Sequence, residues 1–168
     1  AKKSGVFDKV VLNSESDIFN EIANRHEILF YHRPADLGSS KAKSDLVIAD
    51  FMNNFPEADI VAWVNPISPF QTSDEIVKII NYFIDNKLDS LITTEEKQVH
   101  CNFNNKPVNY SPETSFEQTQ NLKPLQSFVY TTMMWRSKRF LSDFNNKGFG
   151  LFCGNFSTFS VSRLSSII

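Results

Sequence analysis

The chain has 168 residues, of which 41% are hydrophobic and 21% charged, and its net charge is −2. This size and composition fit one globular domain with a buried core and argue against an intrinsically disordered chain. No block of Lys and Arg occurs, so a nucleic-acid polymer is not an expected partner. No apolar run reaches the roughly 18 residues of a membrane span, and no signal peptide is recognisable, so we expect a cytoplasmic protein without a membrane partner.

The two cysteines, Cys101 and Cys153, stand alone, without a Cys-x-x-Cys motif or a histidine-rich neighbourhood. Two isolated thiols in a reducing compartment fit this pattern better than a disulfide does. The three histidines, His26, His32 and His100, are too scattered along the chain to predict a metal site.

Strand and helix patterns alternate through the first half of the chain. Apolar, β-branched runs predict strands at 6–13, 27–31, 60–64 and 88–94, and apolar residues at helical spacing predict helices at 17–24, 43–54 and from 73 onward. Thr72 or Ser73 is expected to cap the third helix, because Asp74 and Glu75 follow in its first turn. Further strands are predicted at 128–134 and 148–152, on either side of a helix over 137–144.

Strands that alternate with helices of this length are typical of parallel βαβ units. The sequence therefore predicts an α/β fold, a three-layer sandwich around a mostly parallel, Rossmann-like sheet, as one domain over 1–168. Between 98 and 126 this pattern gives way to polar sequence with one short strand near 108–110. So long an irregular excursion inside a domain indicates a binding loop or an oligomer contact.

Three polar loops follow predicted strands, at 13–16, 32–44 and 65–71. Ligands bind at the carboxyl ends of the strands in such sheets, so these loops form the candidate site. The third loop, Asn-Pro-Ile-Ser-Pro-Phe-Gln, contains two prolines that restrict its backbone and hold its polar groups in place. Spacing alone also allows simpler explanations: a turn that positions the Thr72 cap, and Arg33 as a surface salt-bridge residue.

Three segments recur, in this order and spacing, in one known family: Gly5–Val11 (GVFDKVV), His32–Leu37 (HRPADL) followed by Ser44, and Asn65–Pro69 (NPISP). The chain resembles the acylneuraminate cytidylyltransferases, which make CMP-sialic acid and its relatives. The resemblance covers nearly all of the chain. It implies a CTP-dependent nucleotidyltransferase of capsule or lipopolysaccharide biosynthesis, which joins CMP to a sialic-acid-like nonulosonate, an acidic sugar, and releases pyrophosphate.

The resemblance also implies roles for individual residues. Arg33 and Ser44 would contact the cytosine, whose edge offers O2 and N3 as acceptors and N4 as a donor. Asn65 stands where the family has Gln and would lie near the ribose and the sugar acid, and Ser68 would support that loop. Glu15 takes the place of a family Asp, in a supporting role.

On the side that would bind the sugar acid, the chain departs from the family. Asn65, Gln71 and His100 are the predicted substrate contacts, but Gln71 replaces a usual Arg. Phe103 stands where the family has a basic residue, and 129–131 (Val-Tyr-Thr) replaces Asn-Gly-Ala. Either the substrate is an unusual sugar acid, or this family member has weakened activity.

The family needs Mg²⁺ and basic groups on the phosphates, held by an Asp-x-Asp motif near its C-terminus and a Gly-rich loop near its N-terminus. Neither motif occurs in the chain, so no metal ligand or catalytic residue is predicted within it. Both ends look cut from something longer, and we expect the fragment to be inactive. A homodimer through 98–126 is also implied. The alternatives are a non-catalytic nucleotide-binding relative and a nucleotidyltransferase for a different sugar.

Overall fold

The computed structural model describes residues 1–167, and Ile168, the last residue of the predicted domain, lies outside the described residues. The helices are α1 (Ile18–Arg25), α2 (Ser44–Asn54), α3 (Ser73–Asp85) and α4 (Ser137–Lys147), with 3-10 turns η1 (Lys2–Ser4), η2 (Ala35–Gly38) and η3 (Thr119–Asn121). The strands are β1 (Val11–Ser14), β2 (Leu29–His32), β3 (Ile60–Val64), β4 (Ser90–Lys97), β5 (Asn102–Phe103), β6 (Lys106–Pro107), β7 (Leu125–Arg136) and β8 (Phe156–Ser160).

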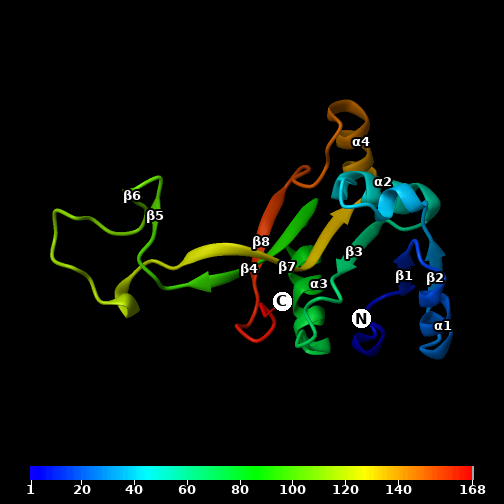
Figure 1. Cartoon of the computed structure of the whole chain (residues 1–168), viewed down its shortest axis with the longest axis horizontal. Helices are drawn as coiled ribbons and strands as arrows, with labels where there is room; N and C mark the ends of the chain where they lie inside the picture. Colours follow the sequence, from blue (N-terminus) through cyan, green and yellow to red (C-terminus); the bar gives the residue numbers. More distant parts are fainter. Residues whose placement is uncertain (168) are drawn as a thin grey trace.

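The strands are divided among three sheets (Figure 1). β1 and β2 form a parallel pair, and β3, β7, β4 and β8 lie side by side in that order. β8 runs parallel to β4, whereas β7 is antiparallel to both of its neighbours, β3 and β4. The predicted α/β class is confirmed, and the sheet is mixed because β7 enters it from the opposite end.

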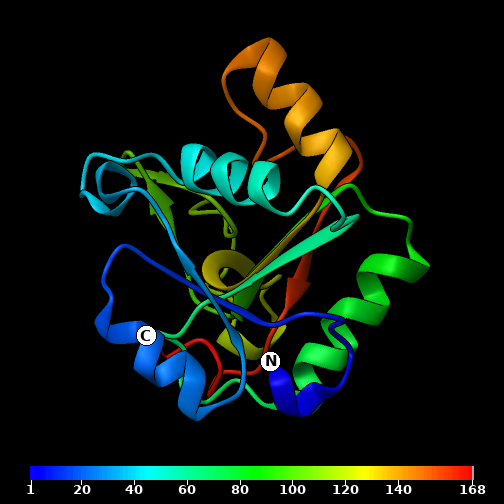
Figure 2. The same cartoon turned by 90° about the vertical axis from the view of Figure 1, so that its right-hand side faces the viewer.

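Helices cover both faces of the four-stranded sheet (Figure 2). α3 lies on one face, where it packs on Leu91 and Met134, and α2 and α4 lie on the other, against Ile92, Met133 and Trp135. Neighbouring residues of a strand point to opposite faces, so the apolar runs in β4 and β7 can supply both layers of the core. This arrangement is the predicted three-layer sandwich.

The start of α3 has the predicted cap. The Thr72 hydroxyl accepts a hydrogen bond from the Glu75 backbone N–H at 3.2 Å. Asp74 and Glu75 lie in the first turn, where the helix dipole favours negative charge. The cap fixes the end of the 65–71 loop relative to the core.

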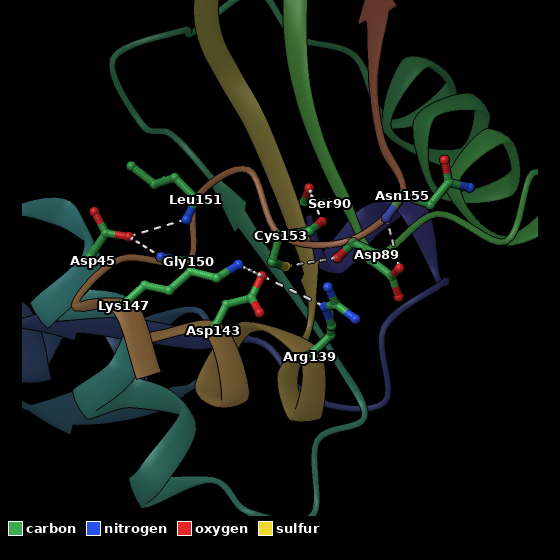
Figure 3. A network of polar contacts seen from close by, with 10 residues as sticks. All are labelled: Asp45, Asp89, Ser90, Arg139, Asp143, Lys147, Gly150, Leu151, Cys153 and Asn155. Atoms are coloured by element: carbon green, nitrogen blue, oxygen red, sulfur yellow. Dashed lines mark hydrogen bonds and ion pairs between the residues drawn. The ribbon is translucent and has the colours of Figure 1, made fainter. Parts of the chain in front are cut away.

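The strand predicted at 148–152 is wrong. Gly148, with a φ of 80°, ends α4 in the left-handed conformation. The Gly150 and Leu151 N–H groups then donate to Oδ1 of Asp45, at 2.7 and 3.1 Å (Figure 3). A carboxylate from α2 therefore takes the hydrogen bonds that a strand would give to a neighbour, and the strand beside β4 is β8.

The loop between α4 and β8 is also tied to the start of β4 (Figure 3). The Ser90 hydroxyl donates to the Cys153 carbonyl at 2.7 Å, and the Asn155 N–H donates to Asp89 Oδ2 at 2.8 Å. Cys153 is buried here as a free thiol and Cys101 is free as well, so the prediction of two isolated thiols is confirmed.

Residues 98–124 form an arm that projects from the body of the molecule between β4 and β7 (Figure 1). The strand predicted at 108–110 is wrong, because the arm's hairpin pairs β5 with β6. Asn104 and Asn105 make its turn with φ values of 49° and 63°, which Asn tolerates better than most residues do. Within residues 1–167, no helix combines the length and the apolar character that crossing a bilayer requires.

Candidate functional site

The carboxyl ends of β1 and β3 meet at the mouth of a cavity of about 480 Å³. Four polar residues line this mouth: Asn13, Ser14, Arg33 and Asn65. The deeper lining is apolar and comes from β1, α2, β3 and Trp135 of β7. The structure thus brings the three predicted loops to one place, as expected for the strand ends of an α/β sheet.

Arg33 is the cation at this mouth. It follows β2 directly, and its N–H donates to the Ser14 carbonyl at 3.1 Å, which continues the ladder between β1 and β2. Its side chain is only 18% exposed, and Nη2 donates to Oε2 of Glu15. Nε is buried without a hydrogen-bond partner. One end of the guanidinium is therefore anchored, while a buried donor remains free for a ligand.

Glu15 serves as the counter-ion of Arg33. The pKa of Glu15 is lowered, first by a hydrogen bond from its own backbone N–H and then by the side-chain hydrogen bond from Arg33. Gly38, at the end of η2, lies so close that a β-carbon on it would collide with the Glu15 carboxyl group. The sequence analysis missed Gly38, although the glycine just after HRPADL was a visible signal.

The 65–71 loop is held by its own backbone. The Asn65 N–H donates to the Thr131 carbonyl at 2.9 Å, and Asn65 Oδ1 accepts from the Ile67 N–H at 3.3 Å. Ser68 is buried, its N–H donates to the Asn65 carbonyl at 3.2 Å, and its hydroxyl has no partner. Asn65 thus lies at the cavity mouth, where its side-chain oxygen already accepts one hydrogen bond, and Ser68 is buried in the same loop.

The Gln71 side chain forms hydrogen bonds inside the protein. Its Nε2 donates to Thr131 Oγ1 at 3.0 Å, and its Oε1 accepts from Thr132 Oγ1 at 2.8 Å. Thr131 Oγ1 also shares a hydrogen bond with Thr93 Oγ1 at 3.0 Å. The sequence analysis did not identify this threonine network, whose signal was two adjacent hydroxyl residues within the apolar run of β7.

Tyr130 precedes these threonines with a φ of 52°. Bulky residues rarely adopt this left-handed conformation, and the resembled family has Gly at the position. The pairing of β4 with β7 is irregular here, with a register shift between Ile92 and Thr94. Tyr130 thus has a backbone conformation that is typical of glycine, although its side chain is an exposed aromatic ring.

The remaining two predicted site residues lie away from the cavity lining. Ser44 is the exposed first residue of α2. His100 belongs to the arm, which projects on the opposite side of the molecule from β1 and β2 (Figure 1). It stacks on Phe116 with ring centroids 4.1 Å apart. The structure therefore brings together Glu15, Arg33 and Asn65, and leaves the roles of Ser44 and His100 as predictions.

Within residues 1–167, no group of three or more Asp, Glu, His or Cys side chains comes together that could hold a metal ion. The Glu15 carboxylate is already paired with Arg33, which lines the cavity mouth. We therefore derive no chemical step through a metal from these residues.

No family model matches the chain. An N-acylneuraminate cytidylyltransferase of Escherichia coli O18:K1:H7 is 28% identical over 83 residues, which are 49% of this chain and 20% of the relative. Another, of Streptococcus agalactiae serotype III, is 24% identical over 102 residues, 60% of this chain and 25% of the relative. The resemblance read from the motifs is confirmed. In these alignments the chain spans only a fifth to a quarter of the length of the curated relatives.

The fold is shared with solved structures, of which two are described here in turn. A 4-diphosphocytidyl-2C-methyl-D-erythritol synthase from Anaerococcus prevotii superimposes with a TM-score of 0.62 at 13% identity, over 96% of this chain and 73% of that one. A CMP:2-keto-3-deoxy-manno-octonic acid synthetase, solved with CTP, gives 0.62 at 12% identity, over 95% and 76%. At such identities the likeness shows the fold alone, and it covers nearly the whole chain.

Proposed function

We propose that the cavity mouth binds the cytosine of CTP, as part of a protein that transfers CMP to an acidic sugar and releases pyrophosphate. The observation that carries the proposal is the buried, unpartnered Nε of Arg33. Leaving such a donor unpaired costs about 1–3 kcal/mol, so a ligand acceptor placed there would be favoured. The curated relatives and the CTP-bound structural neighbour support the choice of nucleotide.

The donor pattern of Arg33 suits cytosine better than uracil. A guanidinium only donates hydrogen bonds, and Glu15 holds this one in a fixed orientation. Cytosine offers two adjacent acceptors, O2 and N3, whereas uracil carries a proton on N3 that would face a second donor. We therefore expect the site to bind CTP at least tenfold more tightly than UTP, since one mispaired buried donor is worth about 1–3 kcal/mol.

For the acceptor, we propose a sialic-acid-like nonulosonate. The support is the similarity to two relatives named N-acylneuraminate cytidylyltransferase. Mg²⁺ remains part of the proposal for the whole protein, with its ligands outside residues 1–167, and so does a cytoplasmic location. We expect residues 1–168 to bind the nucleotide without turning it over, since their sequence contains neither the Asp-x-Asp motif nor the Gly-rich loop.

Calorimetric titration of the chain with CTP and UTP tests the nucleobase site. Arg33→Ala should weaken CTP binding at least tenfold, and Arg33→Lys, which keeps the charge but loses the planar fork, should weaken it nearly as much. Arg25→Ala, at the exposed end of α1, is the matched control and should leave binding unchanged. Equal affinity of the wild-type chain for CTP and UTP would refute the proposed cytosine contact.

Pyrophosphate release from CTP, with Mg²⁺ and a panel of sugar acids, tests the reaction on the complete gene product. Release that depends on a nonulosonate supports the proposal. Release with another sugar only would favour the alternative of a different nucleotidyltransferase. CTP binding by the complete product without release under any condition would favour a nucleotide-binding relative without catalysis.

We also propose that the arm over 98–126 mediates a homodimer. Its side chains Phe103 and Phe116 are 72% and 78% exposed, and Val99 and Val108 are exposed beside them. An arm with this much apolar surface is a candidate interface. Gel filtration at micromolar concentration should give a dimer that Phe103→Ser with Phe116→Ser dissociates, and a wild-type monomer would contradict the proposal.

A further inference from the structure

Asn13 carries a buried amide oxygen to which the protein offers no hydrogen bond. The residue belongs to β1 and lines the mouth of the cavity of about 480 Å³. Within residues 1–167, its Oδ1 is buried and has no partner. Asn is depleted in strands, and a buried acceptor without a partner lowers the stability of a fold. The fold alone therefore does not account for this amide, whereas a ligand that donates a hydrogen bond to it would.

The neighbouring polar side chains at the mouth are already bonded. Oγ of Ser14 accepts a backbone N–H at 3.2 Å, and Oδ1 of Asn65 accepts another at 3.3 Å. At Arg33, Nη2 donates to Glu15, and Nε is buried without a partner. Among the described residues that line the mouth, two buried side-chain atoms thus lack a partner: one donor, Arg33 Nε, and one acceptor, Asn13 Oδ1.

These two side chains project from the same face of the β1–β2 pair. Asn13 is the register partner of Tyr31, and the side chains of paired residues share a face. Arg33 lies two residues after Tyr31 and continues the ladder, since its N–H donates to the Ser14 carbonyl, so it shares that face as well. The face is the one toward α2, because the Tyr31 hydroxyl donates to Asp50 of that helix at 2.8 Å.

The spacing of the two positions suits a nucleobase. Neighbouring strands lie about 4.8 Å apart and rise about 3.3 Å per residue, so the Cα atoms of Asn13 and Arg33 are roughly 8 Å apart. Both side chains can therefore contact one edge of the same flat ring. That edge must present an acceptor to Arg33 and a donor to Asn13.

We propose that Asn13 reads the amino group of the nucleobase: its Oδ1 accepts a hydrogen bond from N4 of cytosine, while Arg33 donates to N3. Cytosine presents the N3 acceptor beside the N4 donor, whereas uracil carries a proton on N3 and a carbonyl oxygen at position 4. Uracil would place O4 against Oδ1, two acceptors with no proton between them. O2 is common to both pyrimidines and cannot distinguish them, so Asn13 would supply a part of the specificity that Arg33 cannot supply through O2.

The same donor and acceptor also fit another base. Adenine presents an acceptor, N1, beside its amino group, whereas guanine presents a carbonyl beside an N–H. The pair Arg33 and Asn13 therefore selects bases with an amino group at this edge over bases with a carbonyl there. The choice of cytosine among the amino bases rests on the proposed function, and ATP is included in the test for this reason.

A ligand without the amino group isolates the contact. Calorimetry compares CTP with UTP and with the triphosphate of 2-pyrimidinone riboside, which is cytidine lacking the 4-amino group. The wild-type chain should bind CTP at least tenfold more tightly than either. Asn13→Leu, which has a similar size and no acceptor, should bind CTP at least tenfold more weakly than wild type and the pyrimidinone at least as tightly, so that the preference disappears. Asn13→Asp keeps an acceptor and should retain a preference of about fivefold or more.

Asn53→Leu is the matched control, because it makes the same substitution at an exposed position of α2, and it should leave all affinities unchanged. Thermal unfolding shows that the variants fold. Since Asn13 Oδ1 has no internal partner, Asn13→Leu should leave Tm unchanged or raise it, whereas a structural role would lower it.

The outcomes separate this inference from the proposed function. CTP binding with an unchanged ratio of CTP to pyrimidinone in Asn13→Leu would overturn the role of Asn13 alone, and so would a wild-type chain that does not distinguish these two ligands. Tighter binding of ATP than of CTP, with its preference over ITP lost in Asn13→Leu, would support the role of Asn13 and overturn the choice of cytosine. Failure of the wild-type chain to bind any of these nucleotides would overturn both.

Discussion

The hydrogen bonds of the Gln71 amide to Thr131 and Thr132 predict a loss of stability when this amide is removed. In Gln71→Leu the Thr132 hydroxyl, which is completely buried, loses its acceptor, and Thr131 loses a donor but keeps its hydrogen bond with Thr93. One buried hydroxyl without a partner costs about 1–3 kcal/mol. Taking the middle of this range, we expect the free energy of unfolding to fall by about 2 kcal/mol, and Tm by about 4–8 °C for a chain of this size.

A double-mutant cycle separates the hydrogen bond from the side chain's packing. Thr132→Val removes the partner hydroxyl and leaves the Gln71 oxygen, which is half-buried and open to water, so it should cost about 1 kcal/mol. In the double variant, both partners of this hydrogen bond are replaced by apolar side chains, so neither is left buried without a partner. The double variant should therefore be at least as stable as Gln71→Leu alone, with a coupling of about 1–2 kcal/mol.

Urea unfolding followed by circular dichroism gives the stabilities, and titration with a sugar acid reports on binding. A Gln71→Leu variant within about 0.5 kcal/mol of wild type, or strictly additive costs in the cycle, would refute the internal role. If wild-type stability were combined with a loss of sugar-acid binding, Gln71 would instead be a substrate contact, as its position in the 65–71 loop predicts.

Two further predictions concern single titratable groups. The ion pair of Glu15 with Arg33 should be fully formed above the ordinary carboxyl pKa of about 4.3, and its stabilising contribution should be lost only as the pH falls through the lowered pKa of Glu15. A carboxyl NMR titration should show this low pKa, which Arg33→Leu should raise part of the way because the backbone hydrogen bond remains; an unchanged value would contradict the pairing. Burial raises the pKa of the Cys153 thiol to about 11, so at pH 8 a disulfide reagent should modify Cys101 first and Cys153 only on unfolding. Fast modification of Cys153, the remaining thiol, in folded Cys101→Ser would contradict the burial.

The elements that the sequence predicts well carry their information locally. The strand at 60–64 and the helix that begins at Ser73 agree with the structure because an apolar run and a capped amphipathic stripe each specify their own conformation. The strand at 148–152 was wrong for a non-local reason. Its amides find a carboxylate, Asp45, that lies more than a hundred residues earlier in the chain, and no local pattern reveals that partner.

The candidate site divides in the same way. Arg33, Asn65 and Glu15 follow strands, and the structure places Arg33 and Asn65 in the lining of one cavity, with Glu15 paired to Arg33. The rule does not say how a side chain is used once it is there. Gln71 has the right place in its loop, but its amide is taken up by Thr131 and Thr132 of a strand about sixty residues later. Only the fold determines which polar groups remain available to a ligand.

The charge distribution along the strand ends narrows what the site can bind. Arg33 lies at the cavity mouth with its charge partly balanced by Glu15, and the 65–71 loop ends in an amide that is already paired. A nucleobase needs donors and acceptors more than net charge, so the described residues suit it. A carboxylate or a triphosphate needs uncompensated cations or a row of free backbone N–H groups.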